Sequence, residues 1–485
     1  MTDTVPQTAA AAPSSAAGPA PPAAPGASFA SLPLSAAMLA NLQALGYLEM
    51  TPIQAASLPL ALAGNDLVAQ APTGSGKTAA FALALLARLQ PRSPATQALV
   101  LCPTRELADQ VTQEIRRLAR AEDNIKALTL CGGTPIRPQI DSLAHGAQIV
   151  VGTPGRIVDH LDRGTLELAT LNTLVLDEAD RMLDMGFMDD IATIAGHCPR
   201  ERQTLLFSAT FPEGIAHIGR RFLRAPREIR LAAQPTAGKI RQRFFEVEDA
   251  QRLHAVGRLL NHYRPARTLA FCNTKQQCRD LVDVLRAEGI AALALHGDLE
   301  QRERDQVLVQ FVNRSCPVLV ATDVAARGLD IADLEAVINV DVTPEVELHT
   351  HRVGRTGRAG AEGWAFSLAS MDEMGRVGRI DQMQGRPSQW QPLAELTPTG
   401  SGPLCAPMVT LQILGGRKEK IRAGDVLGAL TGEGGLPAQA IGKIDVNAFS
   451  TYVAVSREFA VRALKALNDG KVKGKRVKAR PVEPD

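Results

Sequence analysis

From about Phe29 onward, short apolar runs alternate with longer stretches of mixed polarity. Each run is a few residues long, rich in Leu or β-branched residues, and apolar on both faces, which is typical of a strand in a parallel sheet covered by helices. The runs are 67–69, 99–101, 149–151, 174–176 and 205–207, then 269–271, 292–294, 318–320 and 337–340. A buried helix could produce any single run, but nine runs with turn residues between them predict two doubly wound α/β domains in tandem, 29–233 and 238–384.

The two ends of the chain differ in composition from these domains. Residues 1–28 are nearly all Ala, Pro, Ser, Gly and Thr, which bury too little apolar surface to offset the entropy of ordering, so a disordered tail is expected. The Pro-, Gly- and Ser-rich stretch 385–404 predicts a linker. The last segment, 405–485, has strand-like runs and helix-like stretches in the order βαββαβ, which predicts a small α/β sandwich. Its strand-like runs are 409–413, 442–446 and 452–455, its helix-like stretches are 425–430 and 457–467, and its basic end is 471–480.

Charge is distributed unevenly along the chain, although the net charge is only +2. Residues 405–485 contain 14 Lys or Arg and 8 Asp or Glu, which gives +6 and leaves −4 for the remainder. A basic tail on a mildly acidic body favours a localised surface for a polyanion, although charge alone also fits a merely soluble surface.

Cysteine usage and the absence of long apolar runs indicate a cytoplasmic protein. No apolar run approaches the ~20 residues of a membrane span, and the start Met1-Thr2-Asp3 lacks the basic and apolar regions of a signal peptide. The seven Cys form no CxxC pair and are interpreted as small buried residues in a reducing compartment. They are Cys102, Cys131, Cys198, Cys272, Cys278, Cys316 and Cys405.

A glycine-rich loop, Ala71-Pro72-Thr73-Gly74-Ser75-Gly76-Lys77-Thr78, follows the first predicted strand and precedes a helical run. Small residues let backbone N–H groups close around phosphate oxygens at a helix N-terminus. Lys77 is expected to reach the β- and γ-phosphates and Thr78 to ligate Mg²⁺. Ala71 stands where the general pattern has Gly, and a chance Gly-rich turn is the alternative interpretation.

Two carboxylates, Asp177 and Glu178, close the strand at 174–176. Since carboxyl ends of parallel strands share one edge of the sheet, both acids are expected beside the phosphate loop. There Asp177 can hold the metal and Glu178 can activate a water. Alone, three acids within residues 177–180 would usually be a solvated turn.

Three arginines, Arg352, Arg355 and Arg358, are spaced three residues apart with glycines between them. This spacing predicts an exposed cationic strip, and an arginine near a γ-phosphate can stabilise the charge of the transition state. Without the phosphate loop upstream, an ordinary basic turn would be the preferred interpretation.

Taken together, residues from about Phe29 to Leu368 resemble the DEAD-box RNA helicases. Thr51-Pro52-Ile53-Gln54, with Phe29 and Tyr47, is similar to the family's adenine-reading motif, which implies ATP. The amide of Gln54 can pair with the adenine edge, and Phe29 or Tyr47 can stack on its face. The resemblance implies two RecA-like domains, with Gly328 and Asp330 as further nucleotide contacts.

The same resemblance assigns further residues to RNA and to coupling of hydrolysis to strand separation. The expected RNA contacts are Pro103, Thr104, Arg105, Gly133, Thr153, Pro154, Arg156, Thr274, Arg304 and Thr322. Such hydroxyls, amides and arginines contact the sugar-phosphate backbone without reading bases. Ser208, Thr210 and His351 are the expected coupling residues. His349 stands where the family usually has Tyr.

The C-terminal segment resembles the RNA-binding domain of the bacterial DbpA subfamily, with Lys418, Lys473 and Lys475 as expected RNA contacts. The fold implied is RRM-like, although strand 409–413 has no aromatic residue and only Tyr452 could stack a base from the third strand. The resemblance implies a monomeric ATP-dependent helicase that acts on a 23S ribosomal RNA hairpin and on pre-50S particles during assembly of the large subunit.

Three alternatives remain open. They are a general RNA helicase of RNA turnover, a DNA translocase, and a non-enzymatic RNA clamp. The clamp would be expected to have lost Lys77, Asp177, Glu178, Arg355 and Arg358, and all five are present.

Overall fold

The computed structural model describes residues 26–72, 74–211, 213–231, 240–326, 334–357, 362–400, 402–432 and 434–482. These residues form two compact units that divide between Gln234 and Pro235. Each unit is built on its own parallel sheet, and the second also carries the small C-terminal sheet. Most of the expected disordered tail, residues 1–25, lies outside the described residues.

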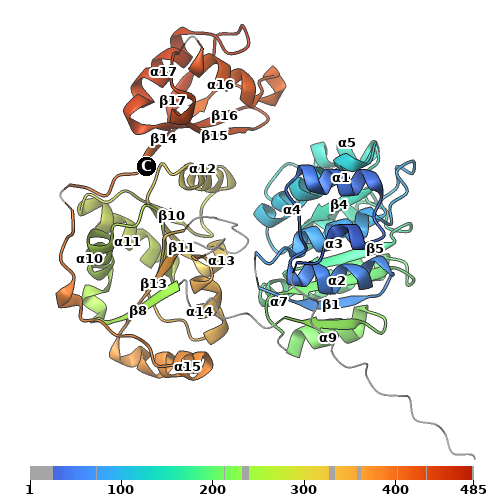
Figure 1. The fold of residues 1–485 in the computed structure, drawn as a ribbon, viewed down its shortest axis with the longest axis horizontal. Helices are drawn as coiled ribbons and strands as arrows, with labels where there is room; N and C mark the ends of the chain where they lie inside the picture. Colours follow the sequence, from blue (N-terminus) through green and yellow to red (C-terminus); the bar gives the residue numbers. More distant parts are fainter. Residues whose placement is uncertain are drawn as a thin grey trace, which may run out of the picture. The chain divides into compact units, whose positions relative to one another are not determined.

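The first unit is a seven-stranded parallel sheet with helices on both faces (Figure 1). The strand order is β3-β4-β2-β5-β6-β1-β7. The strands are β1 (Leu67–Gln70), β2 (Ala98–Leu101), β3 (Ala127–Leu130), β4 (Ile149–Gly152), β5 (Thr173–Asp177), β6 (Gln203–Ser208) and β7 (Arg227–Arg230). The apolar strand residues divide between two core clusters, one packed against each layer of helices.

The helices of the first unit cover its sheet in two layers. One layer is α1 (Ala36–Ala44), α2 (Pro52–Leu62), α3 (Lys77–Leu86) and α4 (Arg105–Leu118). The other contains α6 (Pro154–Asp162), α7 (Ala179–Asp184), α8 (Met188–His197) and α9 (Glu213–Phe222). A short helix, α5 (Arg137–Ala144), joins β3 to β4.

The second unit contains a six-stranded parallel sheet in the order β10-β11-β9-β12-β13-β8. Its strands are β8 (Ile240–Glu246), β9 (Thr268–Cys272), β10 (Ala292–Leu295), β11 (Val318–Thr322), β12 (Ala336–Asn339) and β13 (Gly363–Ala369). Its helices are α10 (Arg252–Tyr263), α11 (Lys275–Ala287), α12 (Gln301–Val312), α13 (Asp323–Ala326), α14 (Val346–Val353) and α15 (Met374–Gln384). The two doubly wound domains expected from the apolar runs are therefore confirmed.

The C-terminal segment has the predicted βαββαβ order and an antiparallel sheet, β15-β16-β14-β17. Its elements are β14 (Met408–Ile413), α16 (Ala423–Thr431), β15 (Ile441–Val446), β16 (Thr451–Ser456), α17 (Ala460–Asp469) and β17 (Ala479–Pro481). Alternate residues of β14 and β16, such as Leu411 and Val453, form a core with the two helices.

The stretch between α15 and β14 is attached to the second sheet at many points. Its backbone extends the sheet at the free edge of β8, where the N–H of Phe244 donates to the Gln389 carbonyl at 2.8 Å and the N–H of Gln391 donates to the Phe244 carbonyl at 2.9 Å. Leu396 and Leu404 are buried in the core of the second sheet. The domain boundaries predicted from composition, 385–404 for a linker among them, remain predictions.

Six of the seven cysteines are buried, as expected, and all seven are unpaired thiols. Cys405 is exposed, so the expectation of burial is wrong there, because it lies between the attached stretch and β14, outside both cores. Within the described residues, no helix is both long and apolar enough to cross a membrane.

Candidate nucleotide and RNA sites

The predicted phosphate loop leads from β1 into the first turn of α3. Gly76 has φ of 93° at the helix N-cap, and Gly74 has φ of 79°, a backbone conformation that glycine adopts without strain. The ammonium of Lys77 is buried and donates to the Ala71 carbonyl at 2.8 Å. Only one of its three N–H donors is used in this bond, so the others can reach an anion above the loop.

The side chain of Gln54 is hydrogen-bonded to this loop. Its Nε2 donates to the Gly76 carbonyl at 3.1 Å, and its Oε1 accepts from the backbone N–H of Thr51 at 2.9 Å in a capping box. A Cβ on Gly76 would lie 2.6 Å from Gln54 Nε2, so only glycine fits there. Each amide atom retains one further hydrogen-bonding position, which is what contact with a base edge requires.

The two aromatic residues expected to stack on the adenine base, Phe29 and Tyr47, lie next to each other in the first unit. The rings of Phe29 and Tyr47 are 6.2 Å apart and nearly perpendicular. Phe29 is buried, while Tyr47 is half-buried and donates from its hydroxyl to Glu114 at 2.5 Å. Burial and the neighbouring Glu114 carboxylate raise the pKa of Tyr47 above its usual range.

The acids after β5 are buried beside the phosphate loop. Burial and the neighbouring Glu178 raise the pKa of Asp177 to about 7, and Lys77 opposes the shift. Glu178 has φ of 52° and forms a 2.9 Å ion pair with Arg181 of α7. The ion pair joins Arg181 Nη1 to Glu178 Oε2, which is buried and has no aligned hydrogen-bond donor within the described residues.

The expected coupling residues join the ends of three strands. The Ser208 carbonyl accepts from the N–H of Ala71 at 3.0 Å, which links the end of β6 to the phosphate loop. Asp180 Oδ2 accepts from the N–H of Thr210 at 2.9 Å, from its hydroxyl at 2.8 Å and from the N–H of Ala209 at 3.2 Å. The sequence reasoning missed Asp180 and Arg181, because their partners could be found only in the folded chain.

The RNA contacts expected in the first unit follow β2, β3 and β4, which are neighbours in the sheet. Thr104 caps α4, accepting from the N–H of Leu107 at 3.3 Å, and Gly133 has φ of 71°. Arg156 donates from both terminal nitrogens to the Thr134 carbonyl at 3.2 Å. Pro103, Arg105, Thr153 and Pro154 lie in the turns and first helical residues after these strands.

The RNA contacts expected in the second unit follow β9, β10 and β11, which are also adjacent. The Thr274 hydroxyl caps α11, accepting from the N–H of Gln277 at 3.1 Å. Arg304 on α12 donates to the Ala325 carbonyl at 2.8 Å, and Thr322 ends β11.

The exposed arginine strip expected in the second unit is not observed. Arg352 is fully buried, with Nε and Nη2 on the two carboxylate oxygens of Asp323 at 2.7 and 2.5 Å and Nη1 on the Asp341 carbonyl at 2.9 Å. Arg355 is also buried, and His351 is half-buried on α14. The prediction of exposure is wrong for Arg352 and Arg355, and for Arg352 the reason is its buried contacts with Asp323 and Asp341. Thr73, Gly328, Asp330 and Arg358 lie outside the described residues.

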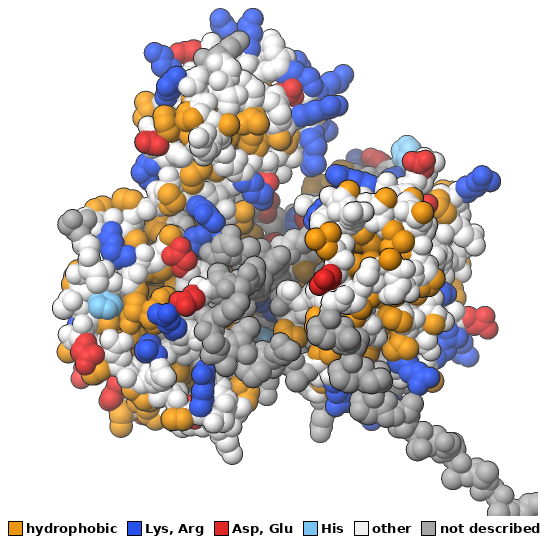
Figure 2. Space-filling view, viewed as in Figure 1, with side chains coloured by type: hydrophobic (Ala, Val, Ile, Leu, Met, Phe, Trp, Pro, Cys, Tyr) orange, Lys and Arg blue, Asp and Glu red, His pale blue; other side chains and the backbone are white. Residues whose placement is uncertain are grey.

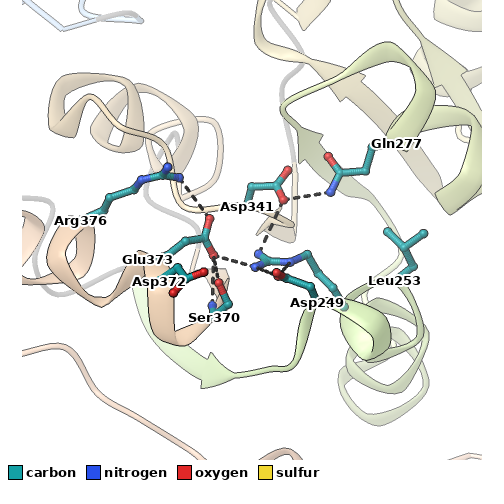
Figure 3. Close-up of a pocket in the computed structure, with 9 residues that line it drawn as sticks. Asp249, Leu253, Gln277, Asp341, Ser370, Asp372, Glu373 and Arg376 are labelled. Carbon is teal, nitrogen blue, oxygen red and sulfur yellow. Dashed lines mark hydrogen bonds and ion pairs between the residues drawn. The ribbon is translucent and has the colours of Figure 1, made fainter.

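A pocket of about 450 Å³ opens at the carboxyl ends of β8, β12 and β13 (Figure 3). Arg252 lines the pocket and pairs with Asp249 at 2.7 Å, with Glu373 at 2.8 Å and with Asp341 at 3.6 Å. Arg376 makes a further pair with Glu373 at 3.3 Å. These charges stabilise one another and hold the strand ends together, and none of them was expected to contact ATP or RNA.

His349 is buried on α14. Its ring stacks on Phe244 at 6.0 Å, and neither ring nitrogen has a hydrogen-bond partner within the described residues. Burial, with Arg352 nearby, lowers its pKa to about 4, so it is neutral at physiological pH. Neutral histidine keeps one N–H donor and one acceptor nitrogen, so both are buried without a partner among the described residues.

The C-terminal domain presents its expected lysines to solvent. Lys418, Lys473 and Lys475 are all exposed, and Lys and Arg side chains gather on one flank of the domain (Figure 2). Tyr452, the aromatic residue expected to stack a base, is buried, and its hydroxyl bonds to Gln412 Nε2 at 3.1 Å.

Three family models match successive parts of the chain. The DEAD/DEAH box helicase model matches residues 51–218, the helicase conserved C-terminal domain matches 251–360, and the DbpA RNA binding domain matches 410–481. The matches follow the two parallel sheets and the C-terminal sheet in order.

Two named relatives are similar to this chain. The chain is 52% identical over 450 residues to the ATP-dependent RNA helicase DbpA of Escherichia coli, which covers 92% of this chain and 97% of the relative. It is 46% identical over 329 residues to the ATP-dependent RNA helicase CshA of Listeria monocytogenes, covering 68% of this chain and 63% of that relative.

Solved structures with similar folds contain ligands. S. cerevisiae Dbp5 bound to RNA and ADP BeF3 aligns with a TM-score of 0.69 and 30% identity, covering 76% of this chain and 96% of that one. Mss116p bound to ssRNA and AMP-PNP aligns with a TM-score of 0.65 and 25% identity, covering 74% of this chain and 77% of that one.

Proposed function

Because the chain belongs to the DbpA subfamily of the DEAD-box ATP-dependent RNA helicases, we propose that it uses ATP hydrolysis to unwind short duplexes of 23S ribosomal RNA during assembly of the large subunit. The helicase activity follows from family membership. The residue roles, the RNA target and the stage of assembly are the proposed parts. The observation that carries the catalytic part is the buried Lys77 ammonium at the phosphate loop, with Asp177 and Glu178 beside it.

In the proposed reaction, Glu178 activates the attacking water. The water oxygen forms a bond to the γ-phosphorus, the bond to the bridging oxygen of ADP breaks, and the water proton passes to the Glu178 carboxylate. Lys77 and the amides at the start of α3 stabilise the phosphate charge. Arg355 and Arg358 of the second unit are proposed to stabilise the charge that develops on the γ-phosphate.

The residues at this site fit a magnesium ion. Thr78 supplies a hydroxyl at the start of α3, and Asp177 is a buried carboxyl whose ionised form needs a nearby cation. When bound, the ion would neutralise part of the charge on the phosphate oxygens. The roles assigned to Thr78 and Asp177 are binding and orientation.

The proposed target depends on the C-terminal domain. Its charge of +6 and its exposed lysines favour contacts with RNA phosphates. Its match to the DbpA RNA binding domain supports a ribosomal target over a general role in RNA turnover. We propose that the protein acts as a cytoplasmic monomer on pre-50S particles.

An ATPase titration tests the target. The full chain is titrated with a 23S hairpin fragment, with unrelated RNA of equal length and with DNA of the same sequence, at one salt concentration. Half-maximal stimulation is expected at a concentration at least about tenfold lower for the 23S fragment, which corresponds to ~1.4 kcal/mol of binding free energy. Equal stimulation by both RNAs would support the general helicase instead, and equal stimulation by DNA would support a translocase.

Substitution of Glu178 by Gln tests the catalytic assignment. The side chain keeps its size but no longer accepts the proton, so kcat is expected to fall at least about a hundredfold, while ATP still binds at Lys77. Unchanged turnover would show that another group activates the water.

A further inference from the structure

The face of the C-terminal sheet that is opposite its helices is covered along its two central strands, β14 and β16. In RNA recognition modules of this fold, aromatic residues on that face stack the bases. Here the Thr410 hydroxyl on that face hydrogen-bonds to Ser315 Oγ at 2.5 Å and accepts from Asn313 Nδ2 at 3.2 Å. Both partners lie just after α12, in the part of the second unit that is built on the six-stranded sheet. The N–H of Met408 donates to the Arg314 carbonyl at 3.3 Å. Bases therefore cannot reach this part of the sheet.

Three further polar residues of this face bond to one another. The Arg480 Nε donates to Gln412 Oε1 at 3.0 Å, and Gln412 Nε2 donates to the Tyr452 hydroxyl at 3.1 Å. Tyr452 is only 6% exposed, so its ring has no free side to offer a base. An RNA base must be held elsewhere on the domain.

An exposed aromatic residue lies in the turn between β15 and β16. The side chain of Phe449 is 67% exposed. Its turn is closed by the N–H of Asn447, which donates to the Ser450 carbonyl at 2.8 Å. The ammonium of Lys418 lies 4.8 Å from the centre of the Phe449 ring.

One neighbouring loop is hydrogen-bonded to this turn, and a further loop is hydrogen-bonded to that loop. The N–H groups of Arg417 and Lys418 donate to the carbonyls of Asn447 and Ala448 at 2.8 and 3.0 Å. The approach is close enough that a Cβ on Gly416 would lie 2.3 Å from the Asn447 carbonyl oxygen. The third loop joins through Lys473, whose ammonium donates to the Lys420 carbonyl at 2.6 Å.

We propose that Phe449 is the stacking site for an unpaired RNA base, with Lys418 and Lys473 holding the flanking phosphates. An aromatic ring fixed on a braced turn loses little entropy when a base stacks on it, and every base has a face that can stack. The neighbouring ammonium groups supply the contacts that a phosphate needs. The proposal rests on the RNA-targeting role of this domain and names the part of the RNA that is held there.

A single exposed Phe is common on protein surfaces, and its contact with Lys418 could be a minor surface interaction. Two observations favour a binding role for Phe449. The central strands of the usual base-stacking face are buried, and the ring lies 4.8 Å from the exposed Lys418 ammonium on a turn that is hydrogen-bonded to a neighbouring loop.

The test compares full-length Phe449→Ala, Phe449→Tyr and Phe449→Leu with the unchanged protein. A matched control is Val461→Ala on α17, which also removes exposed apolar surface. RNA-stimulated ATPase is titrated with a 23S hairpin fragment and with the same fragment carrying abasic sites in its loop. Thermal unfolding is followed in parallel and should not change, because Phe449 is exposed.

Phe449→Ala is expected to raise the half-saturating concentration of the intact fragment about tenfold, which is ~1.4 kcal/mol, with kcat at saturating RNA unchanged. Phe449→Tyr should restore binding, Phe449→Leu should not, and Val461→Ala should match the unchanged protein. On the abasic fragment, Phe449→Ala and the unchanged protein should be equal. Equal half-saturation on the intact fragment, or the same loss on both fragments, would overturn the stacking site. If the unchanged protein showed no preference for the 23S fragment over unrelated RNA, the proposed target itself would fail instead.

Discussion

The hydrogen bond between the Thr210 hydroxyl and Asp180 links the turn after β6 to the acids after β5. Thr210→Val removes this donor and keeps the shape of the side chain. The bond is 2.8 Å long, and Asp180 is 3% exposed, so water does not readily replace the hydroxyl. The carboxylate keeps the N–H groups of Ala209 and Thr210.

A hydrogen bond to a charged group contributes about 1.5–3 kcal/mol. Because the N–H groups of Ala209, Thr210 and Arg181 still donate to Asp180, the loss is expected at the lower end, about 1.5–2 kcal/mol. In a unit of this size each kcal/mol lowers the melting temperature by about 2–4 °C, so Thr210→Val should lower the first unfolding transition by about 3–8 °C.

The assay is thermal unfolding of the full chain, with Thr210→Ser as the matched control because it keeps the hydroxyl. A second readout is the number of duplexes unwound per ATP hydrolysed, which should fall in the Val variant and recover in the Ser variant. If the two variants melted at the same temperature and unwound equally, the Asp180 contact would have no role in stability or coupling.

Three further changes follow from the same kind of contact. Asp177 has a pKa of about 7 in the folded chain against an ordinary value of 3.8, so the folded state binds its proton more tightly than the unfolded state does. The free energy of unfolding should therefore fall as pH rises from about 4 to about 7. In urea unfolding without nucleotide or metal, Asp177→Asn should flatten this pH dependence. Leu396→Ala should cost about 2–5 kcal/mol in chemical unfolding, because Leu396 is buried in the core of the second sheet, whereas a side chain in a free linker would cost almost nothing. Arg352→Lys should lower the free energy of unfolding by about 3 kcal/mol, because lysine cannot make the bidentate contact with Asp323. Equal melting temperatures of the lysine variant and the unchanged protein would contradict this.

The sequence was most informative for strands covered on both faces. Such strands are apolar at every position, so the run Leu174–Leu176 at the centre of β5 was visible without any periodicity. The strands missed were those at or near a sheet edge, namely β3, β7, β8 and β13. β7 shows why, because only Ile229 of its four residues is buried and a pattern that short does not stand out.

The site was predictable where its residues are close together in the sequence. The phosphate loop carries its glycines, lysine and threonine within a few consecutive residues, so their spacing in the sequence already indicates a phosphate-binding site. Asp180 and Thr210 are thirty residues apart, and Arg352 and Asp323 are twenty-nine apart. Neither pairing can be inferred until the strand order is known. The burial of Tyr452 likewise depends on the fold around it.

Strand order also explains how two ligands can share one sheet in the first unit. The RNA contacts expected in this unit follow β3, β4 and β2. The phosphate loop follows β1, the catalytic acids lie at the end of β5 and the coupling residues at the end of β6, so this second set occupies the other half of the edge, the ATP half. The halves meet only where β2 pairs with β5, at Leu101 and Leu176. The Asp180–Thr210 contact lies wholly in the ATP half. Thr210→Val should therefore leave the affinity for RNA without nucleotide unchanged, even as unwinding per ATP falls. Weakened RNA binding without nucleotide would mean that the two halves of the sheet are not independent.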